Sequence, residues 1–174
     1  MSIKRILITG PEATGKSELS KKLAKTYNTF WNPEYARAFL TPGGNYLRDD
    51  LEIILKKQIQ LEMSAIDLAE TYLFCDTGPE VIKIWSEYKY NACSTFIENK
   101  FKNHTYDFTL LTYPDLDWTP DPLRETPDRG ERLILFSRYQ ELLDQEKRSY
   151  SIIKGEGTKR LENAKEAINQ FFKD

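Results

Sequence analysis

A short segment with two glycines, Gly10 to Ser17, constrains this sequence more than any other part of it. It reads Gly-Pro-Glu-Ala-Thr-Gly-Lys-Ser and matches the pattern G-x-x-x-x-G-K-[ST] in full. The aliphatic run from Ile3 to Thr9 predicts a buried strand before it, and leucines at helical spacing predict an amphipathic helix after it. Glycines let backbone N–H groups converge on an anion, and the start of a helix adds further unpaired donors. The segment therefore predicts a phosphate-binding loop between a strand and a helix.

The polar residues of this phosphate loop fit a nucleoside triphosphate with a magnesium ion. Lys16 offers a flexible positive charge to the β- and γ-phosphates, and Ser17 offers a hydroxyl oxygen of the kind that Mg²⁺ prefers. The residues that we expect to bind ATP are Gly10, Glu12, Ala13, Thr14, Gly15, Lys16, Ser17 and Glu18. The pattern alone separates neither ATP from GTP nor a kinase from a GTPase, a motor ATPase or a switch.

Strands and helices are predicted to alternate along the rest of the chain. β-branched and aromatic runs predict further strands at 29–31, 72–75, 108–112 and 150–153. Apolar residues at helical spacing predict helices at 34–40, 49–70, 80–90, 95–102, 131–147 and 159–172, with a turn at 41–44. This alternation is typical of a parallel sheet covered on both faces. We expect one α/β domain over residues 1–174, with the P-loop NTPase or kinase fold and a five-stranded parallel sheet.

Composition is that of a soluble globular protein. Hydrophobic residues make up 40% and charged residues 30%, and the net charge of −2 gives no broad basic surface for nucleic acid or an anionic membrane. No apolar run approaches the roughly 20 residues that cross a bilayer, and the strand pattern begins too close to Met1 for a signal peptide. Cys75 and Cys93 are interpreted as reduced thiols with a packing role. With a single histidine, His104, the sequence does not favour a structural zinc site. We expect a cytoplasmic protein with a small-molecule partner; the sequence gives no oligomeric state.

Two acidic residues follow predicted strands. Asp76 ends the run at 72–75, and Glu34 comes after the second strand and Pro33. Ligands of open α/β sheets bind beyond the carboxyl ends of the strands, and phosphoryl transfer uses one carboxylate at a metal and another near the acceptor hydroxyl. Either acid fits equally well into the first turn of a helix. We expect both to be catalytic together with Lys16, and Ser17 and Asp76 to hold the metal; which acid is the base stays open.

The segment 113–130 has the composition of a lid loop. It contains four prolines and many charges, and it carries Arg124 and Arg129. A closing loop with arginines would cover the developing charge of phosphoryl transfer and exclude water. A solvated loop with surface ion pairs fits the same composition. The chain has no Asn-Lys-x-Asp stretch to read guanine and is short for a motor ATPase, so a small-molecule kinase fits best.

Further stretches carry a more specific pattern than the phosphate loop. In order, they are Asn32–Arg37, Phe74–Thr77, Lys83–Glu87, Pro114–Trp118 and Asp128–Arg129. Together with the phosphate loop, and in this order, they resemble the ribosylnicotinamide kinase domain of NadR-type proteins over nearly the whole chain. The resemblance implies a P-loop kinase that transfers the γ-phosphate of ATP to the 5′-hydroxyl of nicotinamide riboside, giving nicotinamide mononucleotide.

The resemblance also implies roles for single residues. Lys16 and Ser17 would hold the phosphates and Mg²⁺, while Arg124 and Arg129 would belong to the lid. A cationic pyridinium ring favours an aromatic face, although a tryptophan on a helix packs in a core equally often. With these rings included, the expected substrate-binding residues are Glu34, Tyr35, Arg37, Asp76, Trp85 and Trp118.

The chain departs from the family pattern at two places. Relatives usually carry a second acid two residues after the first, where this chain has Gly78, and they often show a glycine before the lid arginine, where it has Pro122-Leu123. Loss of the second acid would shift substrate choice, so a kinase for another nucleoside-like substrate and a regulatory ATPase without a small acceptor remain alternatives. The single histidine leaves no paired-histidine motif for the adenylyltransferase of NadR proteins, and we expect neither that activity nor a DNA-binding domain.

Overall fold

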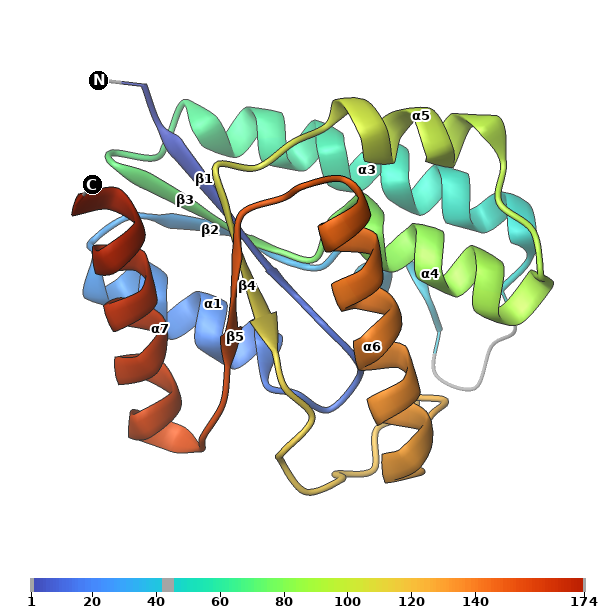
Figure 1. The fold of residues 1–174 in the computed structure, drawn as a ribbon. Helices are drawn as coiled ribbons and strands as arrows, with labels where there is room; N and C mark the ends of the chain where they lie inside the picture. The colour runs from blue at the N-terminus through green and yellow to red at the C-terminus, as the bar shows by residue number, and fades with distance from the viewer. Residues whose placement is uncertain (1, 42–45, 174) are drawn as a thin grey trace.

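The computed structural model describes residues 2–41 and 46–173, and a five-stranded parallel sheet lies at its centre (Figure 1). The strands are β1 (Lys4–Thr9), β2 (Phe30–Asn32), β3 (Tyr72–Asp76), β4 (Phe108–Thr112) and β5 (Tyr150–Ile153), in the order β2-β3-β1-β4-β5. The helices are α1 (Lys16–Thr26), α2 (Ala36–Phe39), α3 (Arg48–Ile66), α4 (Pro79–Tyr90), α5 (Thr95–Asn103), α6 (Arg129–Gln145) and α7 (Gly157–Lys173). The five-stranded parallel sheet of a P-loop kinase fold is thus confirmed.

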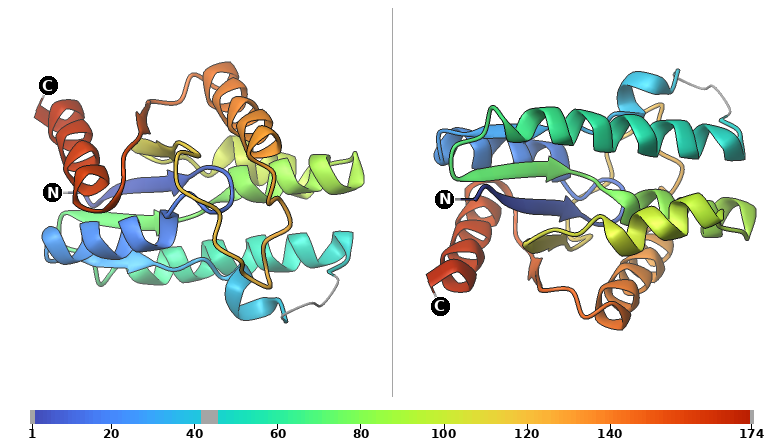
Figure 2. Two further views of the ribbon diagram at one scale, coloured as in Figure 1. Left: turned by 90° about the horizontal axis from the view of Figure 1, so that it is seen from below. Right: turned by 90° about the horizontal axis from the view of Figure 1, so that it is seen from above.

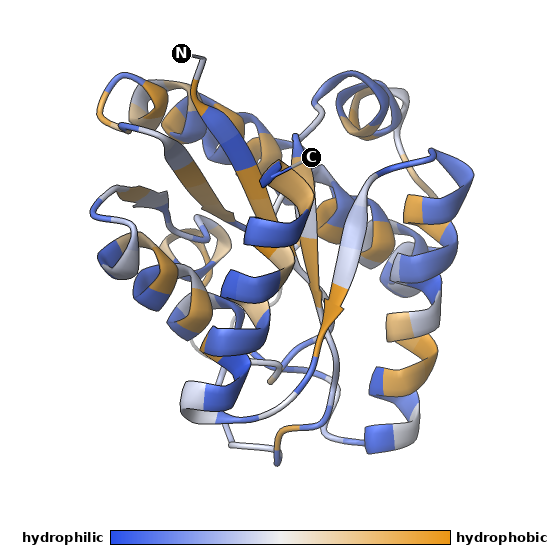
Figure 3. Cartoon of the chain, turned by 60° about the vertical axis from the view of Figure 1, so that its left-hand side comes forward, coloured by the Kyte–Doolittle hydropathy of each residue, from blue (hydrophilic) through white to orange (hydrophobic). Residues whose placement is uncertain are grey.

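Helices cover both faces of the sheet because successive strand residues point to opposite sides (Figure 2). Ile6 and Ile8 of β1 pack with α1 and α7, whereas Leu7 between them packs on the other face with residues of β3 and α3. The helices α4, α5 and α6 also lie on that second face. Figure 3 shows hydrophobic residues along the strands and hydrophilic bands on the outward sides of the helices. No helix in the described ranges is both long and apolar enough to span a bilayer.

Element boundaries differ from the sequence-based expectation by a few residues, most clearly at the end of α3 and the start of α6. The long helix expected to reach residue 70 ends at Ile66, and the helix expected from residue 131 begins at Arg129. The second difference has a clear cause, because the side chain of Asp128 accepts a hydrogen bond from the N–H of Glu131 at 2.7 Å and caps the helix. The turn residues Pro42, Gly43 and Gly44 lie outside the described residues.

All five strands end at the same edge of the sheet, since they are parallel. The phosphate loop follows β1, Glu34 follows β2, Asp76 ends β3, and the lid loop follows β4. The lid loop spans residues 113–128 in the structure, because α6 begins at Arg129. The candidate residues from distant parts of the sequence are thereby gathered at one edge.

Candidate active site

The phosphate loop is held in shape by β4. Gly10 has a φ of 137°, and a Cβ on it would lie 2.6 Å from Oγ1 of Thr112 and 2.7 Å from its carbonyl oxygen. Thr14 donates from Oγ1 to the carbonyl of Pro11 at 2.8 Å and lies 2.7 Å from Thr112 Oγ1. Gly15, with a φ of 73°, immediately precedes α1. The first glycine is required by the close approach of β4, and the second by a left-handed turn into the helix.

Lys16 lies on the phosphate loop, near the strand-end acids Glu34 and Asp76. Nζ of Lys16 donates to the carbonyl oxygens of Gly10 at 3.0 Å and Pro11 at 2.8 Å. Burial lowers the pKa of Lys16, and the negative charges of Glu34, Asp76 and Glu12 act in the opposite direction. The lysine is therefore close to both strand-end acids as well as to the loop.

Asp76 is a buried carboxyl group beside Ser17. Neither of its carboxyl oxygens has a hydrogen-bond partner with good distance and angle in the described part of the chain. Burial, and next the charge of Glu34, raises the pKa of Asp76 to about 6, while the hydroxyl of Ser17 and the charge of Lys16 lower it. Two unpartnered buried oxygens next to a serine hydroxyl are a donor set that fits Mg²⁺.

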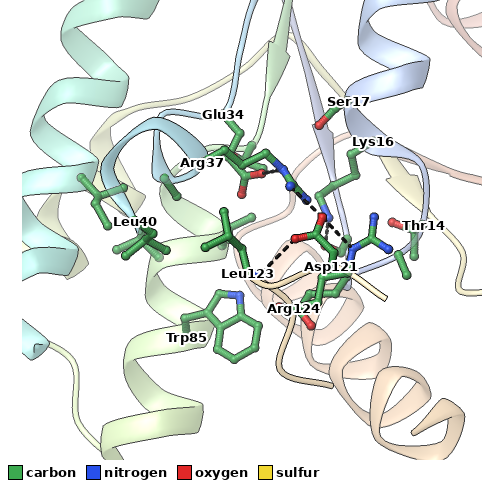
Figure 4. Close-up of a pocket in the computed structure, with 18 of the residues that line it drawn as sticks. Thr14, Lys16, Ser17, Glu34, Arg37, Leu40, Trp85, Asp121, Leu123 and Arg124 are labelled. Atoms are coloured by element: carbon green, nitrogen blue, oxygen red, sulfur yellow. Dashed lines mark hydrogen bonds and ion pairs between the residues drawn. The ribbon is translucent and has the colours of Figure 1, made fainter. Parts of the chain in front are cut away.

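A chain of ion pairs joins the β2 side of the site to the lid loop (Figure 4). Arg37 on α2 donates from Nε to Glu34 at 3.1 Å and from Nη1 to Asp121 at 2.9 Å. Arg124 lies on the other side of Asp121, with Nε 3.6 Å from its Oδ2. Partial burial alone would lower the pKa of Arg37, but the bond to Asp121 and the charge of Glu34 outweigh it and raise that pKa.

A second link joins the lid loop to the phosphate loop through Glu12. Its Oε2 accepts hydrogen bonds from the N–H groups of Glu125 and Thr126, both at 2.9 Å, and from the hydroxyl of Thr126 at 2.7 Å. Thr126 is only 1% exposed. The lid loop is therefore fastened both over α2 and over the phosphate loop.

One cavity of about 440 Å³ connects these groups. Its polar end is formed by the phosphate loop, Glu34, Arg37 and Arg124. Its other end is apolar and is lined by Leu40, Tyr46, Leu51, Ile54, Val81 and Trp85. Figure 4 shows Trp85 and Leu123 on the side of the cavity away from Ser17. The cavity can thus hold a charged group and a flat apolar group at the same time.

A smaller cavity of about 290 Å³ lies on the other side of Gly15. Leu116 of the lid loop, Gly157 and Arg160 line it. Arg160 is 4% exposed and donates to the carbonyls of Thr14 at 3.0 Å and Gly155 at 2.7 Å. It also pairs with Asp115, so one buried guanidinium joins the phosphate loop, the lid loop and the loop after β5.

Most of the residues expected at the site line the larger cavity. All eight residues expected to bind ATP do so, together with Glu34, Arg37, Trp85 and Arg124. Asp76 is fully buried and does not line the cavity, whereas the next two residues, Thr77 and Gly78, do. The phosphate-loop prediction and the two strand-end acids therefore meet in space as the sequence suggested.

Besides Asp76, three expected residues do not line this cavity in the described structure: Tyr35, Trp118 and Arg129. The ring of Tyr35 packs beside Phe39, 6.1 Å between centroids, in the apolar cluster around α3. Trp118 lies against the guanidinium groups of Arg124 and Arg132, at 5.7 and 5.6 Å from its ring centroid. Arg129 is exposed at the first position of α6 and not in the lid loop.

Three functional candidates were missed by the sequence reasoning: Asp121, Gln58 and Arg160. Asp121 lies among the prolines of the lid loop, where an acid has no distinctive pattern. Gln58 is a polar residue on the apolar stripe of α3, and Arg160 stands near the start of α7. A polar side chain on the buried face of a helix was the available signal for the last two.

Fold and site together define a nucleotide-binding protein with the P-loop kinase fold. A family model described as an AAA domain (AAA_28) matches residues 5–160, and the chain belongs to this family. Among solved structures, it is similar to a NadR protein in complex with NR, with a TM-score of 0.81 and 18% identity over 99% of this chain. A NadR protein in complex with NAD and AMP-PNP gives a TM-score of 0.79 at 18% identity over 98% of this chain.

The chain spans about half the length of these NadR proteins, 52% and 50% respectively. It is also similar to thymidylate kinase from Ehrlichia chaffeensis, with a TM-score of 0.62 and 14% identity over 95% of this chain and 98% of that one. At these identities the likeness establishes the fold. The resemblance to NadR-type kinase domains is confirmed at the level of family and fold.

Proposed function

We propose that this chain is an ATP-dependent small-molecule kinase that phosphorylates the 5′-hydroxyl of nicotinamide riboside. One observation carries the proposal: a single cavity joins the phosphate loop to an apolar compartment, with Glu34 and two arginines between them. A kinase needs both substrates in one space, so that the γ-phosphate and the acceptor hydroxyl can meet in line. The fold similarity to NadR proteins supports the choice of acceptor.

The nucleotide is proposed to occupy both cavities. The phosphates bind at the phosphate loop, and the base enters the smaller cavity between Leu116, Gly157 and Arg160. Gly15 lines both cavities, so a nucleotide that occupies both would pass beside it. Lys16 exchanges its two carbonyl partners for phosphate oxygens when ATP binds.

The apolar compartment suits the acceptor's ring. Trp85 and Tyr46 offer aromatic faces, and attraction between such a face and a cationic ring contributes roughly 0.5–2 kcal/mol. Aliphatic side chains of α3 and α4 form the rest of this compartment. The apolar compartment therefore favours a flat ring that carries no phosphate group.

Glu34 and Asp76 have different roles in the proposed reaction. Glu34 lines the cavity and accepts the proton of the hydroxyl, while the oxygen forms a bond to the γ-phosphorus and the bond to ADP breaks. Asp76 and Ser17 would hold Mg²⁺, which when bound neutralises charge on the β- and γ-phosphates. Arg124 covers the transferring group from the lid side.

The direct test is an assay of the protein with Mg·ATP and nicotinamide riboside, with ADP and nicotinamide mononucleotide measured by chromatography. Lys16→Met should lower kcat by about 100- to 1,000-fold, because it removes a positive charge at the transferring phosphate. Glu34→Gln should lower kcat by at least about 100-fold, because it removes the base. Lys25→Met, at an exposed position of the same helix, is the control and should retain activity.

Gly78 favours a second candidate, a kinase of another nucleoside-like substrate. A Cβ at this position would lie 2.6 Å from Oη of Tyr106 and 2.8 Å from Oε2 of Glu80, so the second acid of the relatives cannot be accommodated here unchanged. A panel of ribosides and deoxynucleosides distinguishes the two candidates by the ratio of kcat/KM values. A higher value for any other nucleoside would reject nicotinamide riboside as the substrate. Absence of any phosphorylated product, with steady ATP hydrolysis, would reject both candidates.

A further inference from the structure

Gln58 on α3 joins the two loops that carry the strand-end acids. It is 3% exposed and lines the larger cavity. Its Oε1 accepts the N–H of Tyr35 at 2.7 Å, and its Nε2 donates to the carbonyls of Pro33 and Asp76, each at 3.3 Å. All three partners are backbone groups, from the ends of two neighbouring strands.

The sheet itself cannot make these connections. The last paired residues of β2 and β3 are Asn32 and Cys75, and the two segments that follow are no longer paired with each other. The backbone groups that follow are left without ladder partners at the edge of a buried region, where an unmade hydrogen bond costs about 1–3 kcal/mol. A glutamine amide carries one acceptor and two donors, which matches this set of one N–H and two carbonyls.

The position of Glu34 follows from these bonds. Glu34 lies between Pro33 and Tyr35, and Gln58 holds the backbone on both sides of it. The same amide holds the carbonyl of Asp76. Lys16 lies near both acids, so Gln58 holds the backbone at the two carboxylates that surround this lysine.

We propose that Gln58 is a positioning residue that fixes Glu34 relative to Asp76 for phosphoryl transfer; this rests on the proposed kinase function. Gln58 touches no reacting atom in this role, because its amide is already used by the backbone groups. Displacement of a catalytic group by about 1 Å costs on the order of 100-fold in rate. Loss of the three bonds should therefore lower kcat much more than the affinity for nucleotide.

The test replaces Gln58 with Met, which has a similar length and no amide. Gln58→Met should lower kcat by about 10- to 100-fold and change the Kd of Mg·ADP less than threefold, measured by calorimetric titration. Gln60→Met is the matched control, since Gln60 is exposed on the same helix, and it should match the wild type in both measurements. A parallel loss of nucleotide binding and kcat in Gln58→Met would show a merely structural role and overturn the inference.

A second readout does not depend on activity. The amide hydrogen of Tyr35 should exchange at least tenfold faster in Gln58→Met than in the wild type, whereas Gln60→Met should leave it unchanged. If Gln58→Met does not fold, Gln58→Glu serves instead: it keeps an acceptor for Tyr35 and loses both donors, so kcat should fall while Tyr35 stays protected. Unchanged exchange in Gln58→Met, or unchanged kcat in Gln58→Glu, would refute the inference. Absence of kinase activity in the wild type would instead refute the proposed function, and the exchange measurement would still test the hydrogen bonds.

Discussion

The link between Glu12 and the lid loop makes a quantitative prediction. One carboxylate oxygen of Glu12 accepts three hydrogen bonds, two from backbone N–H groups of Glu125 and Thr126 and one from the Thr126 hydroxyl. Glu12→Ala removes all three acceptor contacts without touching the apolar core. We expect the segment around Thr126 to detach from the phosphate loop more often, while the rest of the fold stays closed.

The size of the effect follows from the surroundings of the bonds. A hydrogen bond to a charged group contributes about 1.5–3 kcal/mol when it is well shielded. Thr126 is buried, but Glu125 is exposed and Glu12 is partly exposed, so water competes for much of the set. We assign about 3 kcal/mol to the three bonds together, and at about 1.4 kcal/mol for each factor of ten this is roughly a 100-fold change in local opening.

Amide hydrogen exchange measured by NMR reports this opening directly. In Glu12→Ala the amide of Thr126 should exchange roughly 100-fold faster than in the wild type, and Glu12→Gln, which keeps a weaker acceptor, should fall between them. Glu18→Ala is the control, because Glu18 is an exposed acid of α1 that pairs with Lys22. If Thr126 in Glu12→Ala exchanges within threefold of the wild type, the reasoning is wrong and the contact does not hold the lid.

Two further predictions concern backbone shape and pH. Gly10→Ala places a Cβ 2.6 Å from Thr112 Oγ1 at a φ of 137°, so we expect strain of about 1–3 kcal/mol and a roughly 10- to 100-fold weaker Kd for Mg·ADP by calorimetry; an unchanged Kd would contradict it. Burial raises the pKa of Glu80 from 4.5 to about 7, so the folded state holds this proton more tightly than the unfolded chain, and stability is lost as the pH rises between these values. Glu80→Gln should therefore be more stable than the wild type by about 3 kcal/mol in urea unfolding at pH 8, and by nearly nothing at pH 4; an equal gain at both values would contradict the assignment.

The sequence predicted the elements of this fold better than their ends. The central strands were recognisable because a buried strand is a short run of mostly apolar and β-branched residues, as in Phe108–Thr112. The start of α6 was misplaced because Asp128 was grouped with the lid loop, although its side chain caps the helix. Capping depends on one side-chain bond, and the apolar period of a helix does not reveal it.

Site residues that belong to a local sequence pattern were predictable, whereas those that act through distant partners were not. The phosphate loop is a contiguous pattern, and all eight residues that it singled out line the larger cavity. Asp121 acts through Arg37, 84 residues away in sequence, and Arg160 acts through Thr14, 146 residues away. Such pairs leave no local pattern. Arg124 and Arg129 looked alike in sequence, and the helix boundary between them decides that only the first reaches the cavity.

The hydrogen bonds at the site fall into two groups: buried bonds beneath the cavity and more exposed bonds of the lid loop. Gln58, Thr112 and Arg160 are buried, and they hold the strand ends and the phosphate loop from below. The bonds of Asp121 and Glu12 to their partners lie nearer to solvent. Bonds of the second kind are cheaper to break, because water replaces the lost partner. We therefore expect the lid loop to move when substrates enter. The buried bonds keep the acids and the phosphate loop in the same relative position through each turnover.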